Sequence, residues 1–204
     1  MVVDHGLFSF YWVLQNIREA SADLFGRNVI CTREATGKRG VMYQENEVSG
    51  IKDHMLEKGE TLAVAESVTA GHLQAALSLA EGATEFFQGG ITAYNMGQKA
   101  RHLRVDPIHA LSCNCVSERI AEEMAFHTLA LFSSHWAIAI TGYAAPVPEL
   151  GIKNLFAFYS IAFDNKILIT EKLTAAGDDI LKVQLYYTNQ VLIRFHNYLK
   201  HHKV

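Results

Sequence analysis

The sequence contains little of what marks membrane-spanning or disordered proteins. No apolar run reaches the roughly 20 residues that a membrane-spanning helix needs, and the longest candidate, around residues 7–14, is interrupted by polar groups. Only 3 of 204 residues are proline, 19% are charged and 50% are hydrophobic, a balance typical of a compact globular protein. We therefore expect a folded chain without membrane association.

Basic charge, paired cysteines and metal-ligand spacings are also scarce. The formal net charge of −3 provides no basic field for a nucleic-acid backbone. Three cysteines, Cys31, Cys113 and Cys115, make no disulfide framework, and the N-terminus does not resemble a secretory signal. The histidines show no HxxxH or HExxH spacing for zinc. We expect a cytoplasmic protein with reduced thiols that binds no nucleic acid, metal or cofactor.

The apolar periodicity beyond residue 50 predicts alternating helices and strands. Helices are expected over 51–58, 70–80, 96–103, 116–132 and 178–199, and strands over 61–65, 91–94, 136–140, 155–163 and 166–173. The last two strands are expected to form a hairpin at Asp164-Asn165. This order predicts an α/β protein, a three-layer α/β/α sandwich with an open, mixed central sheet.

Residues 1–50 form a predicted N-terminal extension to a domain over 51–204. Residues 7–25 carry apolar groups at helical spacing and are rich in aromatics, which predicts an amphipathic helix. Such a stripe is expected to pack on the sheet edge or to build a homodimer or higher homo-oligomer. Residues 27–49 give no clear pattern.

Polar residues gather where three of the predicted strands end, in residues 66–69, 89–99 and 141–142. The carboxyl ends of strands in open α/β sheets are where ligands bind. A serine there needs a base, and a lysine serves at neutral pH only if burial or nearby positive charge lowers its pKa. The alternative is that Ser67 only caps a helix, Tyr94 is a core aromatic and Lys99 is solvated.

Several motifs resemble one known family. Residues 65–71 (AESVTAG) are close to the pattern AESxTGG, and residues 89–99 are close to GGxxxYxxxxK. Residues 140–144 (ITGYA) look like the start of TGxAGP, and residues 116–118 match VSE. In this order and spacing, residues 51–196 resemble the CinA C-terminal domain, a family that includes nicotinamide mononucleotide deamidases.

The resemblance implies an amidohydrolase that releases ammonia from a small carboxamide or a pyridine nucleotide. It implies Ser67 as nucleophile, Lys99 as the base that takes its proton, and Tyr94 as a hydrogen-bonding partner in that transfer. The substrate-binding residues it implies are Glu66, Thr69, Gly71, Gly89, Gly90, Asn95, Thr141 and Gly142. Backbone N–H groups at the start of the helix after Ser67 are then expected to hold an oxyanion or a phosphate.

The chain departs from the family pattern mainly in the parts that hold substrate. Ala70 and Ala145 stand where glycines are usual, and the loop after Ala145 is short. Asp179 stands where the family commonly has arginine, and Val183 where another basic residue is frequent. A lost arginine and an added carboxylate disfavour an anionic nucleotide. The alternative function is therefore a catalytically weak or inactive nucleotide-binding or regulatory protein.

Overall fold

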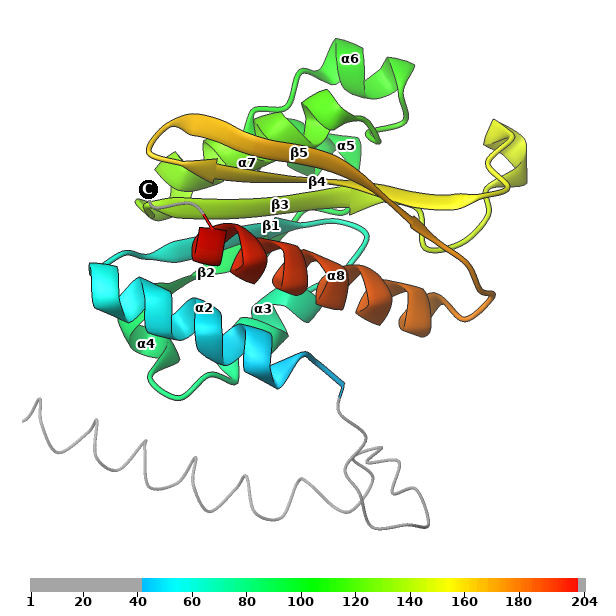
Figure 1. Cartoon of the computed structure of the whole chain (residues 1–204). Coiled ribbons are helices and arrows are strands. Elements are labelled where there is room, and N and C mark those ends of the chain that lie inside the picture. Colours follow the sequence, from blue (N-terminus) through cyan, green and yellow to red (C-terminus); the bar gives the residue numbers. More distant parts are fainter. Residues whose placement is uncertain (1–41, 202–204) are drawn as a thin grey trace, which may run out of the picture. The chain divides into compact units, whose positions relative to one another are not determined.

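The computed structural model describes residues 42–201, which form one sheet with helices on both of its faces (Figure 1). The strands are β1 (Leu62–Glu66), β2 (Phe87–Thr92), β3 (Trp136–Gly142), β4 (Leu155–Phe163) and β5 (Lys166–Ala175). The helices are α2 (Glu45–Lys58), α3 (His72–Ser78), α4 (Ala83–Phe86), α5 (Met96–Leu103), α6 (Pro107–Ser112), α7 (Glu118–Phe132) and α8 (Ile180–His201), with a 3-10 turn η1 (Pro148–Leu150).

The sheet is open and mixed, with strand order β2-β1-β3-β4-β5. β1 pairs in parallel with both β2 and β3, whereas β4 runs antiparallel to β3 and to β5. Parallel strands need crossover connections, and helices supply them here. The predicted hairpin between β4 and β5 is confirmed, because its turn is formed by Asp164 and Asn165, both with left-handed backbone.

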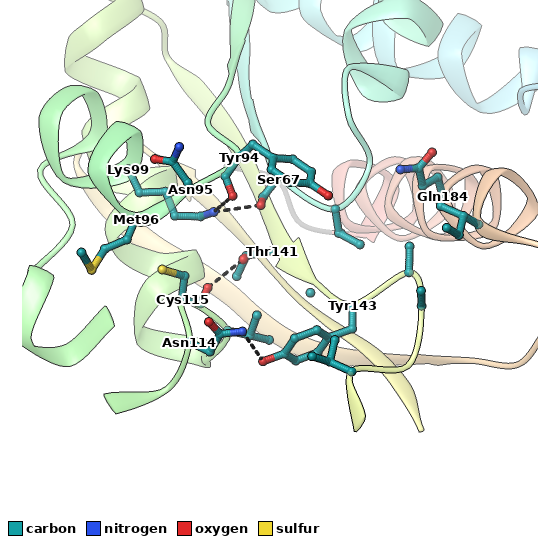
Figure 2. Close-up of a pocket in the computed structure, with 17 residues that line it drawn as sticks. Ser67, Tyr94, Asn95, Met96, Lys99, Asn114, Cys115, Thr141, Tyr143 and Gln184 are labelled. Carbon is teal, nitrogen blue, oxygen red and sulfur yellow. Dashed lines mark hydrogen bonds between the residues drawn. The ribbon is translucent and has the colours of Figure 1, made fainter. Parts of the chain in front are cut away.

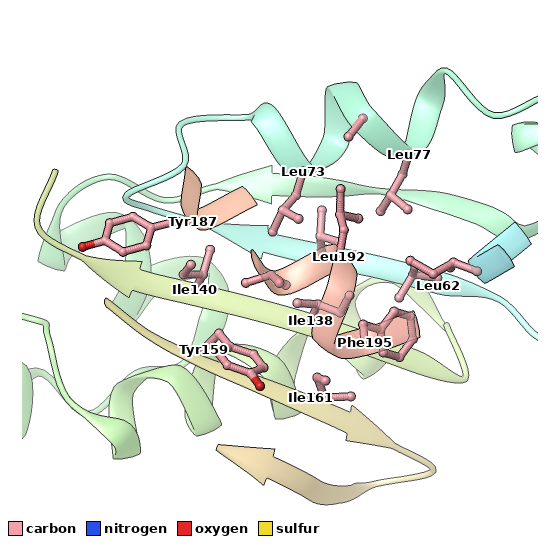
Figure 3. Close-up of a cluster of buried hydrophobic side chains, with 14 of the residues drawn as sticks. Leu62, Leu73, Leu77, Ile138, Ile140, Tyr159, Ile161, Tyr187, Leu192 and Phe195 are labelled. Atoms are coloured by element: carbon pink, nitrogen blue, oxygen red, sulfur yellow. The ribbon is translucent and has the colours of Figure 1, made fainter. Parts of the chain in front are cut away.

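Two apolar clusters hold the helices against the sheet. Side chains alternate between the two faces of a strand, so Val64 and Ile138 face α8 and α3, whereas Ala65 and Ala139 face α7. Figure 3 shows the first cluster, in which α8 packs across the central strands. The alanines leave room for α7 to lie close to the sheet. The predicted α/β fold with an open mixed sheet and helices on both faces is confirmed.

Three elements differ from the prediction for identifiable reasons. The helix predicted over 51–58 begins earlier, at Glu45, and ends where Gly59 adopts a left-handed conformation. The strand predicted over 91–94 lies over Phe87–Thr92 and includes the glycine pair Gly89 and Gly90, which have no side chains to show the strand pattern. α6 was missed because Pro107 was taken as a breaker; proline is favoured at the first position of a helix, which Asp106 caps here.

The prediction of an aromatic helix over residues 7–25 falls outside the described residues. The homo-oligomer and the cytoplasmic location stay predictions. Within residues 42–201, no helix combines the length and apolar character that crossing a bilayer requires.

Candidate active site

The parallel register brings the ends of three strands to one edge of the sheet. Glu66, the last residue of β1, pairs with Thr92 of β2 and with Ile140 of β3. The Ser67 N–H donates to the Ile140 carbonyl at 3.0 Å, and the Ala93 N–H donates to the Glu66 carbonyl at 2.8 Å. These bonds fix the Ser67 backbone between the strands that lead to the other predicted site segments.

Lys99 reaches this edge from α5. Lys99 and Leu103 are one turn apart on the buried face of that helix, and Lys99 is only 1% exposed. Its Nζ donates to Ser67 Oγ at 2.8 Å and to the Tyr94 carbonyl at 3.2 Å (Figure 2). It also donates to the Ala93 carbonyl at 2.9 Å. The expectation that Lys99 is buried and lies beside Ser67 is met.

Burial makes the Lys99 amine easier to deprotonate than a solvated lysine. Burial lowers the pKa of Lys99 below its ordinary value of 10.5, and only the Cys115 thiol opposes this by favouring the charged amine. Among residues 42–201 no carboxylate forms an ion pair with Lys99. A neutral amine has two hydrogens and one lone pair. In that neutral state the two backbone carbonyls can accept both hydrogens, and the Ser67 hydroxyl then donates to the lone pair instead of accepting from Nζ.

Tyr94 contributes differently from the prediction. Its backbone carbonyl accepts the hydrogen bond from Lys99, while its side chain is 76% exposed. The phenol oxygen makes no hydrogen bond to any other residue of the described stretch 42–201. Its ring lines the cavity next to Ser67 (Figure 2). A role for the phenol in proton transfer stays a prediction.

A cavity of about 430 Å³ opens over Ser67 and Lys99. The residues that line it come from the ends of β1, β2 and β3, from the segment before α7, and from the first turns of α5 and α8: Ser67, Val68, Tyr94, Asn95, Met96, Lys99, Asn114, Cys115, Val116, Thr141, Gly142, Tyr143, Ala144, Ala145, Val147, Ile180 and Gln184. Thr141 Oγ1 donates to the Cys115 carbonyl at 2.8 Å. This volume lies within the range of small-molecule sites.

The N-terminus of α3 is occupied by the chain itself. The buried Glu66 carboxylate accepts hydrogen bonds from the N–H groups of Gly71, Leu73 and Gln74 at 3.1, 3.0 and 2.9 Å. The expectation that these N–H groups hold an oxyanion or a phosphate is therefore wrong. The Val68 N–H, by contrast, has no hydrogen-bond partner within residues 42–201 and belongs to a residue of the cavity wall.

With this geometry established, comparison with known proteins places the chain in a family. Residues 45–199 match the model of the CinA C-terminal domain. The chain belongs to the CinA C-terminal domain family. The CinA-like protein of Synechocystis sp. is 37% identical over 133 residues, which are 62% of this chain and 32% of that protein. The chain therefore spans about a third of the length of that curated relative.

Solved CinA structures have the same fold. The competence damage-inducible protein A of Klebsiella pneumoniae superposes with a TM-score of 0.73 at 26% identity, covering 78% of this chain and 98% of that one. A CinA superfamily protein of Escherichia coli gives a TM-score of 0.69 at 25% identity, covering 83% and 98%. The likeness therefore extends over nearly the whole of each solved chain.

Several predicted substrate residues of this CinA domain lie outside the cavity wall. They are Glu66, Thr69, Gly71, Gly89 and Gly90. Thr69 Oγ1 is buried and has no hydrogen-bond partner within the described chain. A Cβ on Gly90 would lie 2.6 Å from Val64 Cγ2, so this glycine allows close packing. A direct contact of these five residues with substrate stays a prediction.

Three other predicted residues do line the cavity, and two of them have structural partners. Thr141 and Asn95 both use their side chains within the chain, because Asn95 Oδ1 accepts from the Gln98 N–H at 3.0 Å and caps α5. Gly142 lies against β4, where a Cβ would approach Ala157 Cα to 2.5 Å.

Sequence reasoning missed part of the cavity wall. Asn114 and Cys115 both have left-handed backbone, with φ of 49° and 61°, and Asn114 Nδ2 donates to the Tyr143 hydroxyl at 3.2 Å. Gln184 comes from α8, far along the chain. The close pair Cys113 and Cys115 was the one visible signal of an unusual turn, whereas nothing local identified Gln184.

Proposed function

We propose that this CinA domain is an amidohydrolase of the nicotinamide mononucleotide deamidase type, which converts a small carboxamide to a carboxylate and releases ammonia. One observation carries the proposal: the buried Lys99 Nζ lies 2.8 Å from Ser67 Oγ at the floor of a cavity. A serine hydroxyl becomes an effective nucleophile when an adjacent base accepts its proton. Lys99 is the base within reach.

The first half of the reaction acylates Ser67. Ser67 Oγ attacks the carboxamide carbon while its proton passes to the neutral Lys99 amine, and the carbonyl oxygen becomes an oxyanion. The free N–H of Val68, the residue after the nucleophile, is available to stabilise that oxyanion. Lys99 then gives the proton to the amide nitrogen as the carbon–nitrogen bond breaks. Ammonia leaves, and the substrate carbonyl remains as an ester on Ser67.

The second half releases the product. A water oxygen attacks the ester carbon while one water proton passes to Lys99. As the bond to Ser67 breaks, Lys99 returns that proton to Ser67 Oγ, which restores the free hydroxyl. The carbonyls of Ala93 and Tyr94 keep the amine aimed at Ser67 throughout. The same amine thus serves as base and acid in both halves.

The test measures the chemistry of Ser67 in two independent ways. The first is ammonia release from nicotinamide mononucleotide, nicotinamide riboside and nicotinamide, where Ser67→Ala is expected to lower kcat/KM about a thousandfold or more. The second is acylation by p-nitrophenyl acetate, where peptide mass spectrometry is expected to find one acetyl group on Ser67. Ser78→Ala is the control, because Ser78 is an exposed serine on α3. Unchanged turnover in Ser67→Ala contradicts the proposal.

The same measurements distinguish the enzyme from the alternative, a CinA-like binding or regulatory protein. Such a protein binds a carboxamide or nucleotide, as a thermal shift reports, but neither releases ammonia nor acylates Ser67. The buried amine beside Ser67 favours the enzyme. A binding protein has no need for a lysine whose burial is not compensated by a carboxylate within the described chain.

A further inference from the structure

We infer that the substrate of this site is a small carboxamide that carries no phosphate or other anionic group. The inference deepens the proposed function and rests on it for the reaction, but it concerns the cavity that any substrate must enter. It follows from two features: the charge of the cavity wall and the state of the helix N-termini around it.

The cavity wall offers no free positive charge. Among the lining residues that the structure describes, Lys99 is the only basic side chain, and no arginine is present. The Lys99 amine is bound to Ser67 and to two backbone carbonyls. The other polar side chains of the wall include no carboxylate and no further basic group; they are Ser67, Tyr94, Asn95, Asn114, Cys115, Thr141, Tyr143 and Gln184. An anion would therefore lose hydration there without a cation to replace it.

The helix N-termini around the cavity carry side-chain caps. A helix start binds phosphate when its N–H groups are free. Here Glu66 caps α3, and Asp179 Oδ1 accepts from the Lys182 N–H at 3.2 Å and caps α8. Both caps are carboxylates, so they add negative charge at the starts of these two helices.

α5, whose first turn lines the cavity, and α7, which follows the lining segment 114–116, have neutral caps. Asn95 Oδ1 caps α5 through the Gln98 N–H, and Ser117 Oγ accepts from the Ile120 N–H at 3.2 Å and caps α7. Each of these four helices thus begins with a side chain of this chain that accepts a hydrogen bond from at least one of its first N–H groups. The wall is suited to a neutral carboxamide, because its amide side chains can form hydrogen bonds with the substrate amide and its phenol rings can pack against a substrate ring.

The test compares two ligands that differ only in a phosphate. Nicotinamide riboside and nicotinamide mononucleotide share the same carboxamide and sugar. We expect kcat/KM for ammonia release to be at least tenfold higher for the riboside, and thermal shifts to rank the two ligands in the same order. Equal or better use of the nucleotide overturns the inference, and so does failure of the protein to bind either ligand.

A charge introduced into the wall makes the same comparison within the protein. Gln184→Arg adds a cation to the first turns of α8 at the cavity. It is expected to shift the ratio of the two kcat/KM values at least tenfold toward the nucleotide. Gln184→Met, similar in length and uncharged, is the matched control and should change both substrates alike. An unchanged ratio in Gln184→Arg contradicts the inference.

Failure of the inference and failure of the proposed function give different results. If p-nitrophenyl acetate acylates Ser67 while the nucleotide is the better substrate, the amidohydrolase stands and the inference falls. If Ser67 is not acylated and no ammonia forms, yet the riboside raises the melting temperature more than the nucleotide does, the inference on ligand charge stands and the enzyme falls.

Discussion

Lys99 Nζ donates a 2.8 Å hydrogen bond to Ser67 Oγ although 32 residues separate the two in the chain. The contact depends on the parallel pairing of β1 with β2, which carries the start of α5 to the end of β1. It also depends on the β2 end, where two carbonyls that no longer pair in the sheet bind the amine. The sheet thus supplies both the position of the serine and the orientation of its base.

The rate of Ser67 acylation should rise with pH through the lowered pKa of Lys99. Only the neutral amine accepts a proton, so kcat/KM is low where Lys99 is charged and levels off above its pKa. Because burial lowers that pKa, the midpoint is expected clearly below the ordinary lysine value of 10.5. A pH profile with p-nitrophenyl acetate, corrected with Ser67→Ala, measures it. A midpoint at or above the ordinary lysine pKa argues against Lys99 as the base.

The free energy of unfolding should depend on pH because of the same pKa shift, and the sign of that dependence is fixed. Between the lowered pKa of folded Lys99 and its unfolded value of 10.5, the unfolded chain binds more protons, so stability rises with pH. The free energy of unfolding of the wild type should therefore rise relative to Lys99→Met across that window, with a slope approaching about 1.4 kcal/mol per pH unit. Urea unfolding at several pH values measures the difference in free energy of unfolding between the wild type and Lys99→Met. The contributions of the other titratable groups cancel in this difference. A difference that does not vary with pH contradicts burial of the amine.

Glu66→Gln should destabilise the fold by about 2 kcal/mol. The carboxylate accepts from three backbone N–H groups and from Gln74 Nε2 at the start of α3. An amide offers one acceptor and turns an NH2 group toward these donors. Glu81→Gln is the control, an exposed position expected to change stability by less than about 0.5 kcal/mol. Equal effects of the two substitutions in urea unfolding would mean that Glu66 does not hold this helix.

Gly90→Ala should cost about 1–3 kcal/mol of stability. A Cβ there would lie 2.6 Å from Val64 Cγ2 and 2.7 Å from the Val64 carbonyl oxygen, which belongs to the paired strand and cannot move cheaply. The matched control is Gly97→Ala in α5, where the nearest atom is 3.5 Å away and alanine favours the helix by about 0.5–1 kcal/mol. The midpoint of thermal unfolding should fall for Gly90→Ala and rise for Gly97→Ala. A tolerated Gly90→Ala contradicts the close approach of β2 to Val64 of β1.

The sequence was sufficient where a pattern is local. The apolar runs Trp136–Ile140 and Leu155–Phe163 predicted their strands, and polar residues after buried strands predicted the site edge. It was insufficient where a residue's role depends on distant partners. Glu66 was predicted to contact substrate, yet its carboxylate caps α3, and Gln184 reaches the cavity only because α8 folds back onto the sheet.

Ala70→Gly should stabilise the protein next to the site. Ala70 has φ of 52°, in the left-handed region, where an alanine Cβ costs about 1–2 kcal/mol. Glycine removes that strain but is more flexible when unfolded, so the net gain expected is about 0.5–1 kcal/mol. Ala75→Gly, at an exposed position inside α3, should instead lose about 1 kcal/mol. Urea unfolding of the two variants measures both signs, and a loss in Ala70→Gly would show that the alanine Cβ is not strained at this turn.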